Sequence, residues 1–456
     1  MEKSPEHGLP VVLFNGEEIA SITDSIDSGI FANQMDTLYQ KLAELEEKST
    51  RALIKYVTGM KYGFVNPKSL YKKEHAISFL QPDSTYYVQL YSDLKKDPIA
   101  LLMEVQPKDR VYQKMQDVYR DLENKKDLEI EKIKDIGTTV YKVGTENNNI
   151  ASIAKRLIAT GEYTPDPDDS LYVELNDKLM IAVNDFRRRI SYPEDEEIGS
   201  RTIEALNRPM TYYQDKIRAN MARYSWKRVK KHEDKHIEVI VPAFKLIATN
   251  KEEKPLIMKV CVGTVANKTP LLESDISYLN LNPVWNVPKS IAQGEVSVKQ
   301  KRDSTYLRRN NMKLFKGGKE VDPGTIDWAS VNPSKFNYYI RQGSGNGNSL
   351  GRIKFMFNND CSVYLHDTPV QRAFARKNRA VSHGCVRVHR PVELAFFCLS
   401  PPTDVYKDQL RYSIDRRPET QEGKKLASQN KLKKLPDIIN PKDKISLAID
   451  YYTVYM

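Results

Sequence analysis

The sequence predicts a multi-domain α+β chain in which helices come first and strands follow. With 456 residues the chain is too long for one ordinary core, so two to four domains are expected. Up to about residue 226 apolar residues recur at helical spacing, whereas from about residue 236 they alternate and are rich in β-branched types. A charged segment at 230–235 separates the part with helical spacing from the part with alternating spacing.

The first 167 residues are predicted to form a helical scaffold domain. From Asn33 to Val57 apolar side chains keep helical spacing, with acids and lysines between them. Further amphipathic helices are expected over 85–94, 98–105 and 110–134. The dense charge of the last one is typical of a solvated helix face, and nothing in this part of the sequence indicates chemistry.

A compact helical module is expected at residues 168–208, after a loop rich in proline and aspartate. Two short helices, over 175–189 and 198–207, flank an acidic turn in this module. A connecting segment at 209–235 follows, and it contains a long predicted helix over 212–226.

The remaining residues, 236–456, are predicted to form a β-rich, mixed-sheet sandwich. Strands are expected over 237–247 and 256–264, and the chain ends in an aromatic strand over 445–455. The basic, polar stretch at about 299–335 is interpreted as a mobile, lid-like insertion, and 424–434 as a basic loop.

Composition limits the partners of this protein. The net charge is +11, but lysine and arginine are interleaved with acids and no stacking platform accompanies them, so nucleic acid is not expected as a partner. No run of eighteen apolar residues is present, and no membrane span is expected. The N-terminal residues also lack the apolar core of a signal peptide, which leaves open a cytoplasmic protein or a removed export segment.

No metal site and no cofactor are expected. The histidines His7, His75, His232 and His236 form no metal-ligand pattern with Cys, Asp or Glu. Three of the four cysteines, Cys261, Cys361 and Cys398, stand in apolar runs that favour inert core thiols.

The fourth cysteine stands in a stretch, 364–387, that has the residues for nucleophilic catalysis. Cys385 follows a glycine, and His366 and His383 precede it between apolar residues that suit buried strands. A thiolate near neutral pH needs an imidazole and backbone N–H donors to stabilise it. Tyr364 stands two residues before His366, so on a strand the two share a face; Tyr364 then lines the cleft or packs in the core.

This stretch resembles the active-site signature of the L,D-transpeptidases, the YkuD-like catalytic domain. The resemblance rests on His366, a spacing of fifteen residues, and the run 382–387, which reads Ser-His-Gly-Cys-Val-Arg. It extends outward to 282–291, with Trp285, and to 348–355. The chain looks most like the long, multi-domain periplasmic members, and its 168–208 module resembles their small peptidoglycan-binding domain.

The resemblance implies a role for each residue of the site. Cys385 would be the nucleophile and His366 its base, with the imidazole oriented by the backbone carbonyl of Asp367. N–H groups of His383, Gly384 and Cys385 would form the oxyanion hole. Arg387 would bind a substrate carboxylate or brace the pocket. Substrate contacts are also expected from Tyr364, Ser382 and Trp285, with core packing as the alternative for Tyr364 and Trp285.

The implied reaction is acyl transfer between peptidoglycan stem peptides. Cys385 would form a thioester with the third residue of a tetrapeptide stem, release D-alanine, and pass the acyl group to the side-chain amine of a neighbouring stem, forming a 3-3 cross-link. Transfer to water, as in an L,D-carboxypeptidase, and a non-catalytic wall-binding protein are the alternatives. The resemblance also implies a periplasmic or cell-envelope location and inhibition by carbapenems.

Overall fold

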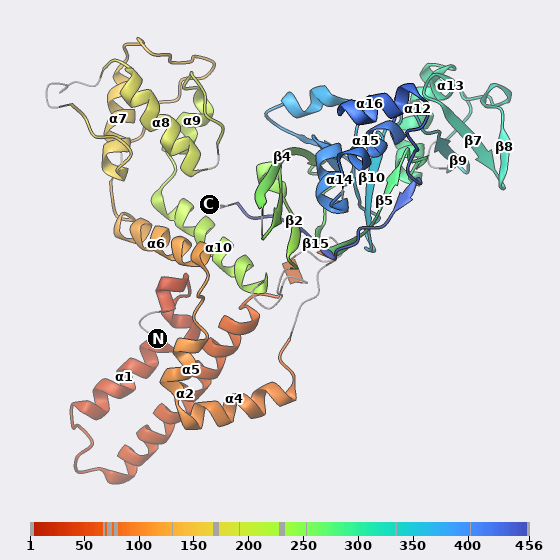
Figure 1. Ribbon diagram of the computed structural model, residues 1–456. Coiled ribbons are helices and arrows are strands. Elements are labelled where there is room, and N and C mark those ends of the chain that lie inside the picture. The colour runs from red at the N-terminus through yellow and green to blue at the C-terminus, as the bar shows by residue number, and fades with distance from the viewer. Residues whose placement is uncertain are drawn as a thin grey trace. The chain divides into compact units, whose positions relative to one another are not determined.

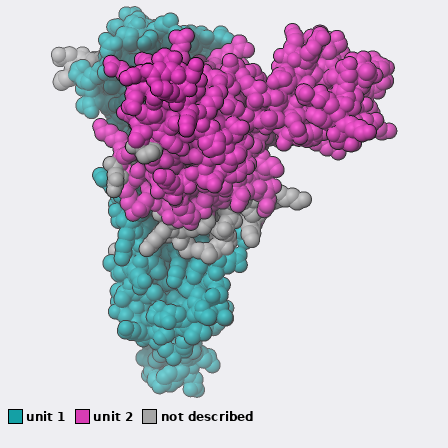
Figure 2. All heavy atoms as spheres, turned by 45° about the vertical axis from the view of Figure 1, so that its right-hand side comes forward, with its two compact units in different colours: residues 1–67, 79–231, 452–456 teal, residues 68–78, 232–451 magenta. Residues whose placement is uncertain are grey.

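The structure is a computed structural model that divides into two compact units (Figure 2). Unit 1 comprises residues 1–67, 79–231 and 452–456, and unit 2 comprises residues 68–78 and 232–451. The structure describes residues 4–66, 69–70, 75–76, 81–129, 131–166, 173–190, 192–227, 233–251, 253–332, 335–401 and 403–453. The predicted boundary between residues 167 and 168 lies outside these ranges, as do His232 and the side chain of His75.

The first part of unit 1 is helical, as predicted (Figure 1). Its helices are α1 (Gly16–Asp27), α2 (Met35–Tyr62), α4 (Ser84–Lys96), α5 (Pro98–Glu104) and α6 (Arg110–Asn124). Aspartate caps the last three, since the side chains of Asp83, Asp97 and Asp109 accept hydrogen bonds from first-turn N–H groups. Helix α1 was not predicted, and the helix expected over 110–134 is shorter because α6 ends at Asn124.

The second part of unit 1 holds α7 (Asn148–Thr160), α8 (Asp177–Arg189), α9 (Ser200–Leu206) and α10 (Met210–Lys227). One apolar core joins α7, α8 and α9, and it includes Ile153, Val183 and Ile203. The acidic turn between α8 and α9 folds over the buried guanidinium of Arg187, which donates to the backbone oxygens of Asp195 and Glu197. The hydrogen bonds that the buried Arg187 donates to these carbonyls therefore hold the acidic turn that the sequence predicted.

Unit 2 is built on a closed ring of eight strands. These are β2 (Lys235–Ile240), β3 (Lys245–Asn250), β4 (Glu253–Gly263), β5 (Leu271–Leu281), β10 (Ile353–Phe357), β11 (Leu365–His366), β13 (Val386–Val388) and β15 (Ile445–Asp450). The pairing runs β5-β10-β11-β13-β4-β3-β2-β15 and returns from β15 to β5. Parallel pairing occurs between β11 and β13 and between β15 and β2, so the sheet is mixed, as predicted.

The strand predicted over 237–247 is two strands. A 3₁₀ turn at Val241–Ala243 separates β2 from β3, and Phe244 after it has a φ of 52°. Pro242 lacks the N–H that a central strand needs, so the chain reverses there and β3 returns antiparallel to β2. Three short strands add to this ring: β1 (His75–Ala76) and β14 (Ile438–Ile439) pair with β5, and β12 (Ala380–Ser382) pairs with β4.

The largest core of unit 2 lies between this ring and the helices that follow β13. Helices α14 (Pro391–Leu399), α15 (Asp404–Ser413) and α16 (Gln421–Ser428) had no counterpart in the sequence prediction. Leu394, Cys398 and Leu410 of α14 and α15 are fully buried in that core. The loop predicted over 424–434 was wrong at its start, because Thr420 caps α16 by accepting a hydrogen bond from the N–H of Gly423.

A second, four-stranded sheet is formed by the chain segment between β5 and β10, which themselves pair directly (Figure 1). Its order is β6 (Trp285–Asn286), β9 (Tyr339–Gln342), β7 (Met312–Lys316) and β8 (Lys319–Val321), with α11 (Lys289–Ile291), α12 (Ser297–Arg302) and α13 (Tyr306–Arg309) beside it. The predicted insertion at 299–335 lies within this lobe, apart from residues 333 and 334, which are outside the described ranges. The lobe has its own apolar core, including Leu307, Leu314 and Trp328, which an irregular loop would lack.

None of the helices in the described part of the chain combines the length and the apolar composition needed to cross a membrane.

Candidate active site

Three neighbouring strands place the predicted site residues in one row across the sheet. His366 of β11 lies opposite Arg387 of β13 and, on its other side, opposite Lys354 of β10. Arg387 lies opposite Cys261 of β4. Since successive side chains of a strand point to opposite faces, the row faces away from the core. The alternating residues of these strands are buried in the core: Ile353, Phe355, Leu365, Val386 and Val388.

The turn before β13 is fixed by two side-chain hydroxyls. Ser382 is 2% exposed, and its hydroxyl donates to the carbonyl of Cys385 at 2.6 Å while it accepts the N–H of Gly384 at 3.1 Å. Thr269 donates to the carbonyl of Gly384 at 2.8 Å. Gly384 has a φ of 112°, a region that side chains rarely adopt, so glycine is required there. The turn therefore holds Cys385 in one orientation.

One of the three N–H groups predicted as oxyanion donors already has an acceptor within the chain. We expected donors from the N–H groups of His383, Gly384 and Cys385, but the N–H of Gly384 is already bonded to Ser382. The N–H groups of His383 and Cys385 remain as the proposed donors. Ser382 accordingly shapes the turn, and its contacts are to the backbone on either side of Gly384.

The Cys385 thiol is half-buried beside Tyr364. Its Sγ lies 4.0 Å from the carbonyl oxygen of Ser362, to which the S–H donates. Burial raises the pKa of the Cys385 thiol, whereas hydrogen bonds with Tyr364 and the positive charges of Lys354 and Arg387 oppose that rise. The sequence led us to expect a lowered thiol pKa, so the direction found here is opposite, because burial outweighs the neighbouring cations.

His366 is buried and neutral. It lies on β11, which pairs with β13, the strand that begins directly after Cys385. Its Nδ1 is 2.5 Å from the backbone oxygen of Asp367, so the predicted contact with that carbonyl is present. Burial and the charge of Arg387 lower the pKa of His366 to about 3, against the carbonyls of Asp367 and Leu350. Within the described part of the chain no hydrogen bond joins His366 to the Cys385 thiol, whose acceptor is Ser362. Such contacts often shorten only when substrate binds.

The side chain of Asp367 holds in place the backbone carbonyl that contacts His366. Its two oxygens accept the N–H groups of Arg352 and Thr368 at 2.8 and 2.7 Å. A Cβ at Gly351, where φ is 63°, would come within 2.4 Å of this carboxylate. Gly351 is thus needed for the close approach of the two segments, and its backbone conformation favours glycine as well. Burial raises the pKa of Asp367, which these hydrogen bonds oppose.

Two aromatic residues predicted as substrate contacts adjoin the thiol. The Tyr364 ring lies 5.7 Å from the His366 ring, edge to face, and its hydroxyl is close enough to Cys385 and Trp285 for both to influence its pKa, which burial raises. Trp285 belongs to β6 of the second sheet. Tyr364 therefore links the thiol to the lobe that carries Trp285, and neither aromatic residue is fully buried.

The two remaining predicted site residues, Arg387 and His383, lie in different surroundings. Arg387 lies in the row beside His366, and its Nε is buried without a hydrogen-bond partner among the described residues. His383 is 46% exposed and its Nε2 is 3.5 Å from Glu295 in the turn that precedes α12. His383 thus points toward the second lobe, which fits bracing better than contact with the reacting atoms.

Lys354 is a site residue that sequence reasoning did not assign. Its Nζ lies 3.9 Å from the centre of the Tyr364 ring, a cation–π contact, and it faces the thiol closely enough for the two to interact electrostatically. Burial lowers the pKa of Lys354. The signal was present in the sequence: a lysine between Ile353 and Phe355 on a strand points away from the core that they fill.

The described residues contain no cluster of three or more His, Cys, Asp or Glu side chains that could hold a metal ion. All four cysteines are free thiols, and Cys261 and Cys398 are fully buried while Cys361 is half-buried. The face described above carries a thiol, a neutral imidazole and two cationic side chains.

Comparisons with known proteins point to one family. Residues 234–406 match the family model of the L,D-transpeptidase catalytic domain, YkuD, and residues 1–118 match a Scaffold domain model. A curated protein of Haemophilus influenzae named "Putative L,D-transpeptidase" is 38% identical over 164 residues. That match covers 36% of this chain and 33% of the relative, so the chain spans about a third of the relative's length.

Solved structures of L,D-transpeptidases are also similar to this chain. One from Stackebrandtia nassauensis is 13% identical, with 57% of this chain and 90% of that chain covered and a TM-score of 0.22. One from Mycobacterium smegmatis is 11% identical, with 36% and 53% covered and a TM-score of 0.21.

The range that matches the catalytic model holds every candidate site residue, from Trp285 to Arg387. Its strands carry the row of His366, Lys354 and Arg387 beside a thiol at Cys385. The candidate site therefore lies within the part of the chain, residues 234–406, that matches the L,D-transpeptidase catalytic domain.

Proposed function

We propose that this protein is a peptidoglycan L,D-transpeptidase that forms 3-3 cross-links. Cys385 attacks the carbonyl of the third residue of a tetrapeptide stem, so that a C–S bond forms and the C–N bond to the terminal D-alanine breaks. The thiol proton passes to the leaving amine. The side-chain amine of a neighbouring stem then attacks the thioester, an amide forms, and the thiol regains a proton.

The main support for this proposal is that Cys385, His366 and Arg387 lie on the same face of the sheet. His366 is neutral and its Nδ1 lies at the Asp367 carbonyl, so the imidazole can accept the thiol proton without first losing one of its own. The burial that raises the thiol pKa also means that proton transfer to His366 accompanies attack, because a free thiolate is disfavoured beforehand.

The charge that develops on the attacked carbonyl needs donors, and we assign these to the N–H groups of His383 and Cys385. A donor of this kind contributes roughly 3–4 kcal/mol to transition-state stabilisation in comparable acyl-transfer enzymes. Gly384 contributes through its backbone conformation, which aims these two groups, since its own N–H is bonded to Ser382.

We assign recognition of a substrate carboxylate to Arg387 together with Lys354. The Nε of Arg387 is buried and unpartnered in the described structure, and an arginine can bind a carboxylate through two parallel hydrogen bonds. Lys354 sits beside the ring of Tyr364 on the same face. Tyr364 and Trp285 would form the wall of the stem-peptide cleft from the two lobes of unit 2.

The remaining features of the proposal rest on the family. We propose a periplasmic or cell-envelope location, a lid role for the 299–335 insertion, and a wall-binding role for the 168–208 module. The domain division into 1–167, 168–208, 209–235 and 236–456 belongs to the same proposal. Transfer to water is the second candidate reaction, since the same thioester would then give a tripeptide.

The nucleophile is tested by intact mass after incubation with a carbapenem. We expect one adduct on the wild-type chain and none on Cys385→Ala, whereas Cys361→Ala, which removes a nearby half-buried thiol, keeps the adduct. An adduct that persists in Cys385→Ala, or its absence from the wild type, overturns the assignment. A non-catalytic wall-binding protein would give no adduct.

Transfer and hydrolysis are separated with purified tetrapeptide muropeptides. Cross-linked dimers and free D-alanine are expected from a transpeptidase, and tripeptides with D-alanine from a carboxypeptidase. Predominance of tripeptides at high acceptor concentration would contradict the transfer reaction while leaving the thioester chemistry intact.

A further inference from the structure

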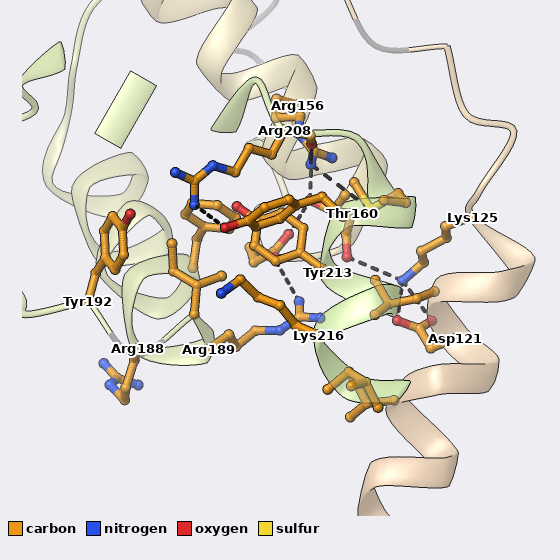
Figure 3. A pocket seen from close by; sticks show the side chains of 18 of the residues that line it. Asp121, Lys125, Arg156, Thr160, Arg188, Arg189, Tyr192, Arg208, Tyr213 and Lys216 are labelled. Carbon is orange, nitrogen blue, oxygen red and sulfur yellow. Dashed lines mark hydrogen bonds and ion pairs between the residues drawn. The ribbon is translucent and has the colours of Figure 1, made fainter. Parts of the chain in front are cut away.

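Unit 1 contains a cavity that the proposed reaction does not use. It lies among α6, α7, α8, α10 and the loops beside them, and has a volume of about 510 Å³ (Figure 3). That size suits a small organic molecule. Much of the lining is apolar or aromatic: Val118, Leu122, Phe186, Ile190, Tyr192, Met210, Tyr212, Tyr213 and Ile217.

The cationic groups of the lining outnumber the acidic ones. They are Lys125, Arg156, Arg188, Arg189, Arg208 and Lys216, against Asp121 and Glu162. Several are already neutralised, since Lys125 pairs with Asp121, Arg189 with Glu162, and Arg208 with Glu204. Arg188 likewise pairs with Asp185 and Glu194. Among the described residues, Arg156 and Lys216 are the lining cations that make no ion pair, although the Glu162 carboxylate acts electrostatically on Arg156.

Arg156 is a buried cation with an unsatisfied donor. It is 2% exposed, and its Nε and Nη2 donate to the carbonyls of Leu206 and Arg208 at 2.8 and 3.4 Å. Its Nη1 has no hydrogen-bond partner among the described residues. Burying a guanidinium without a paired anion is costly, so a position of this kind favours an incoming negative charge.

Lys216 provides a second, more accessible cation at the same cavity. Its Nζ lies 5.2 Å from the centre of the Tyr212 ring, and among the described residues it makes no ion pair. The hydroxyl of Tyr212 accepts a hydrogen bond from Arg208 at 3.0 Å. Figure 3 shows the Lys216 side chain in the middle of the cavity, with Tyr192, Arg189 and Arg208 around it.

We propose that this cavity binds a small organic carboxylate with an apolar or aromatic body. The carboxylate would lie between Lys216 and Arg156, and the body against the wall formed by Phe186, Ile190 and Tyr213. One carboxylate supplies the single negative charge and the two oxygens that the two cations lack. A doubly charged, strongly hydrated anion such as phosphate would place further oxygens against the apolar wall, which disfavours it.

The test uses the full chain and isothermal titration calorimetry with sodium benzoate, benzamide and inorganic phosphate. We expect saturable 1:1 binding of benzoate, with benzamide and phosphate at least tenfold weaker. Benzamide keeps the ring and loses the charge, and phosphate keeps the charge and loses the ring. Equal binding of benzoate and benzamide, equal binding of benzoate and phosphate, or no saturation with benzoate overturns the proposal.

Lys216→Gln is the decisive variant because Lys216 is partly exposed and its replacement leaves the core intact. Loss of one charge-assisted hydrogen bond, about 1.5–3 kcal/mol, corresponds to a roughly tenfold or greater loss of benzoate affinity. Lys114→Gln, on the exposed surface of α6 outside the cavity, should leave affinity unchanged. Unchanged affinity in Lys216→Gln refutes the site. Ile190→Trp, which fills the cavity, should abolish binding, with its fold checked by circular dichroism.

This proposal is independent of the transpeptidase function. Acylation of Cys385 by a carbapenem should be the same in Lys216→Gln and wild type, so a failure of either proposal is recognised separately.

Discussion

Replacement of Ser382 by alanine tests how the nucleophile is held. The Ser382 hydroxyl makes two hydrogen bonds in a buried place, one to the Cys385 carbonyl at 2.6 Å and one from the Gly384 N–H at 3.1 Å. Ser382→Ala leaves both backbone groups without that partner. Each unsatisfied buried group costs about 1–3 kcal/mol, so for the two groups we expect a loss of about 2–6 kcal/mol in the free energy of unfolding of unit 2.

The same change should slow acylation, because the freed turn no longer aims Cys385 and the two proposed oxyanion donors. A loss of about tenfold to a hundredfold corresponds to roughly 1.4–2.7 kcal/mol of transition-state stabilisation. Urea unfolding followed by circular dichroism measures the first effect, and the time course of the carbapenem adduct measures the second.

Ser428→Ala is the matched control, since that exposed hydroxyl makes one hydrogen bond, to the carbonyl of Lys425 at 2.9 Å. It should change stability by less than about 0.5 kcal/mol, as surface substitutions usually do. If Ser382→Ala unfolds at the same urea concentration as this control and acylates at the wild-type rate, the hydroxyl does not hold the turn and the reasoning fails.

Three further predictions concern the same site. Gly384→Ala forces a side chain into a backbone conformation with φ of 112°, at a cost of about 1–3 kcal/mol, so acylation should slow at least tenfold; a wild-type adduct rate would contradict this. Lys354→Met removes a positive charge that opposes the raised pKa of Cys385, so part of the loss of acylation rate at pH 7 should be recovered toward pH 10, while the exposed Lys319→Met keeps the wild-type profile. A loss that is equal at all pH values would show that Lys354 acts through the substrate carboxylate alone and not on the thiol. Burial lowers the pKa of His366 to about 3, below the ~6.5 of an unfolded chain, so the unfolded state binds the proton more readily between these values. The free energy of unfolding should therefore be fully retained above pH 6.5 and fall as the pH drops toward 3, and urea titrations of His366→Gln should give a shallower fall; an equal slope in both proteins counts against a buried neutral His366.

The site motif could be predicted from the sequence because its residues are close in the chain. His366 and Cys385 belong to segments that become neighbouring strands, and the glycine before the cysteine matches the positive φ that the turn requires. The Asp367 carbonyl contact follows directly from adjacency to His366. Local sequence was therefore sufficient to predict the turn and to select the thiol and imidazole that we propose as nucleophile and base.

The second lobe and the helices after β13 could not be predicted from local patterns. Trp285 reaches Tyr364, which stands 79 positions later in the chain, through the pairing of β6 with β9. The strand predicted over 237–247 was wrong because Pro242 ends β2, and periodicity alone does not weigh one proline against a run of β-branched residues.

The sequence indicated, through residue type and spacing, which thiol, imidazole, glycine and arginine we propose to carry the chemistry. It also determined that helices precede strands, through the change from helical to alternating periodicity. The electrostatics of the site could be known only from the folded chain, because the burial of each group depends on segments that are distant in the sequence. The raised pKa of Cys385, the neutral His366, the cation of Lys354 beside Tyr364 and the occupied N–H of Gly384 all arise where β10, β11 and β13 meet.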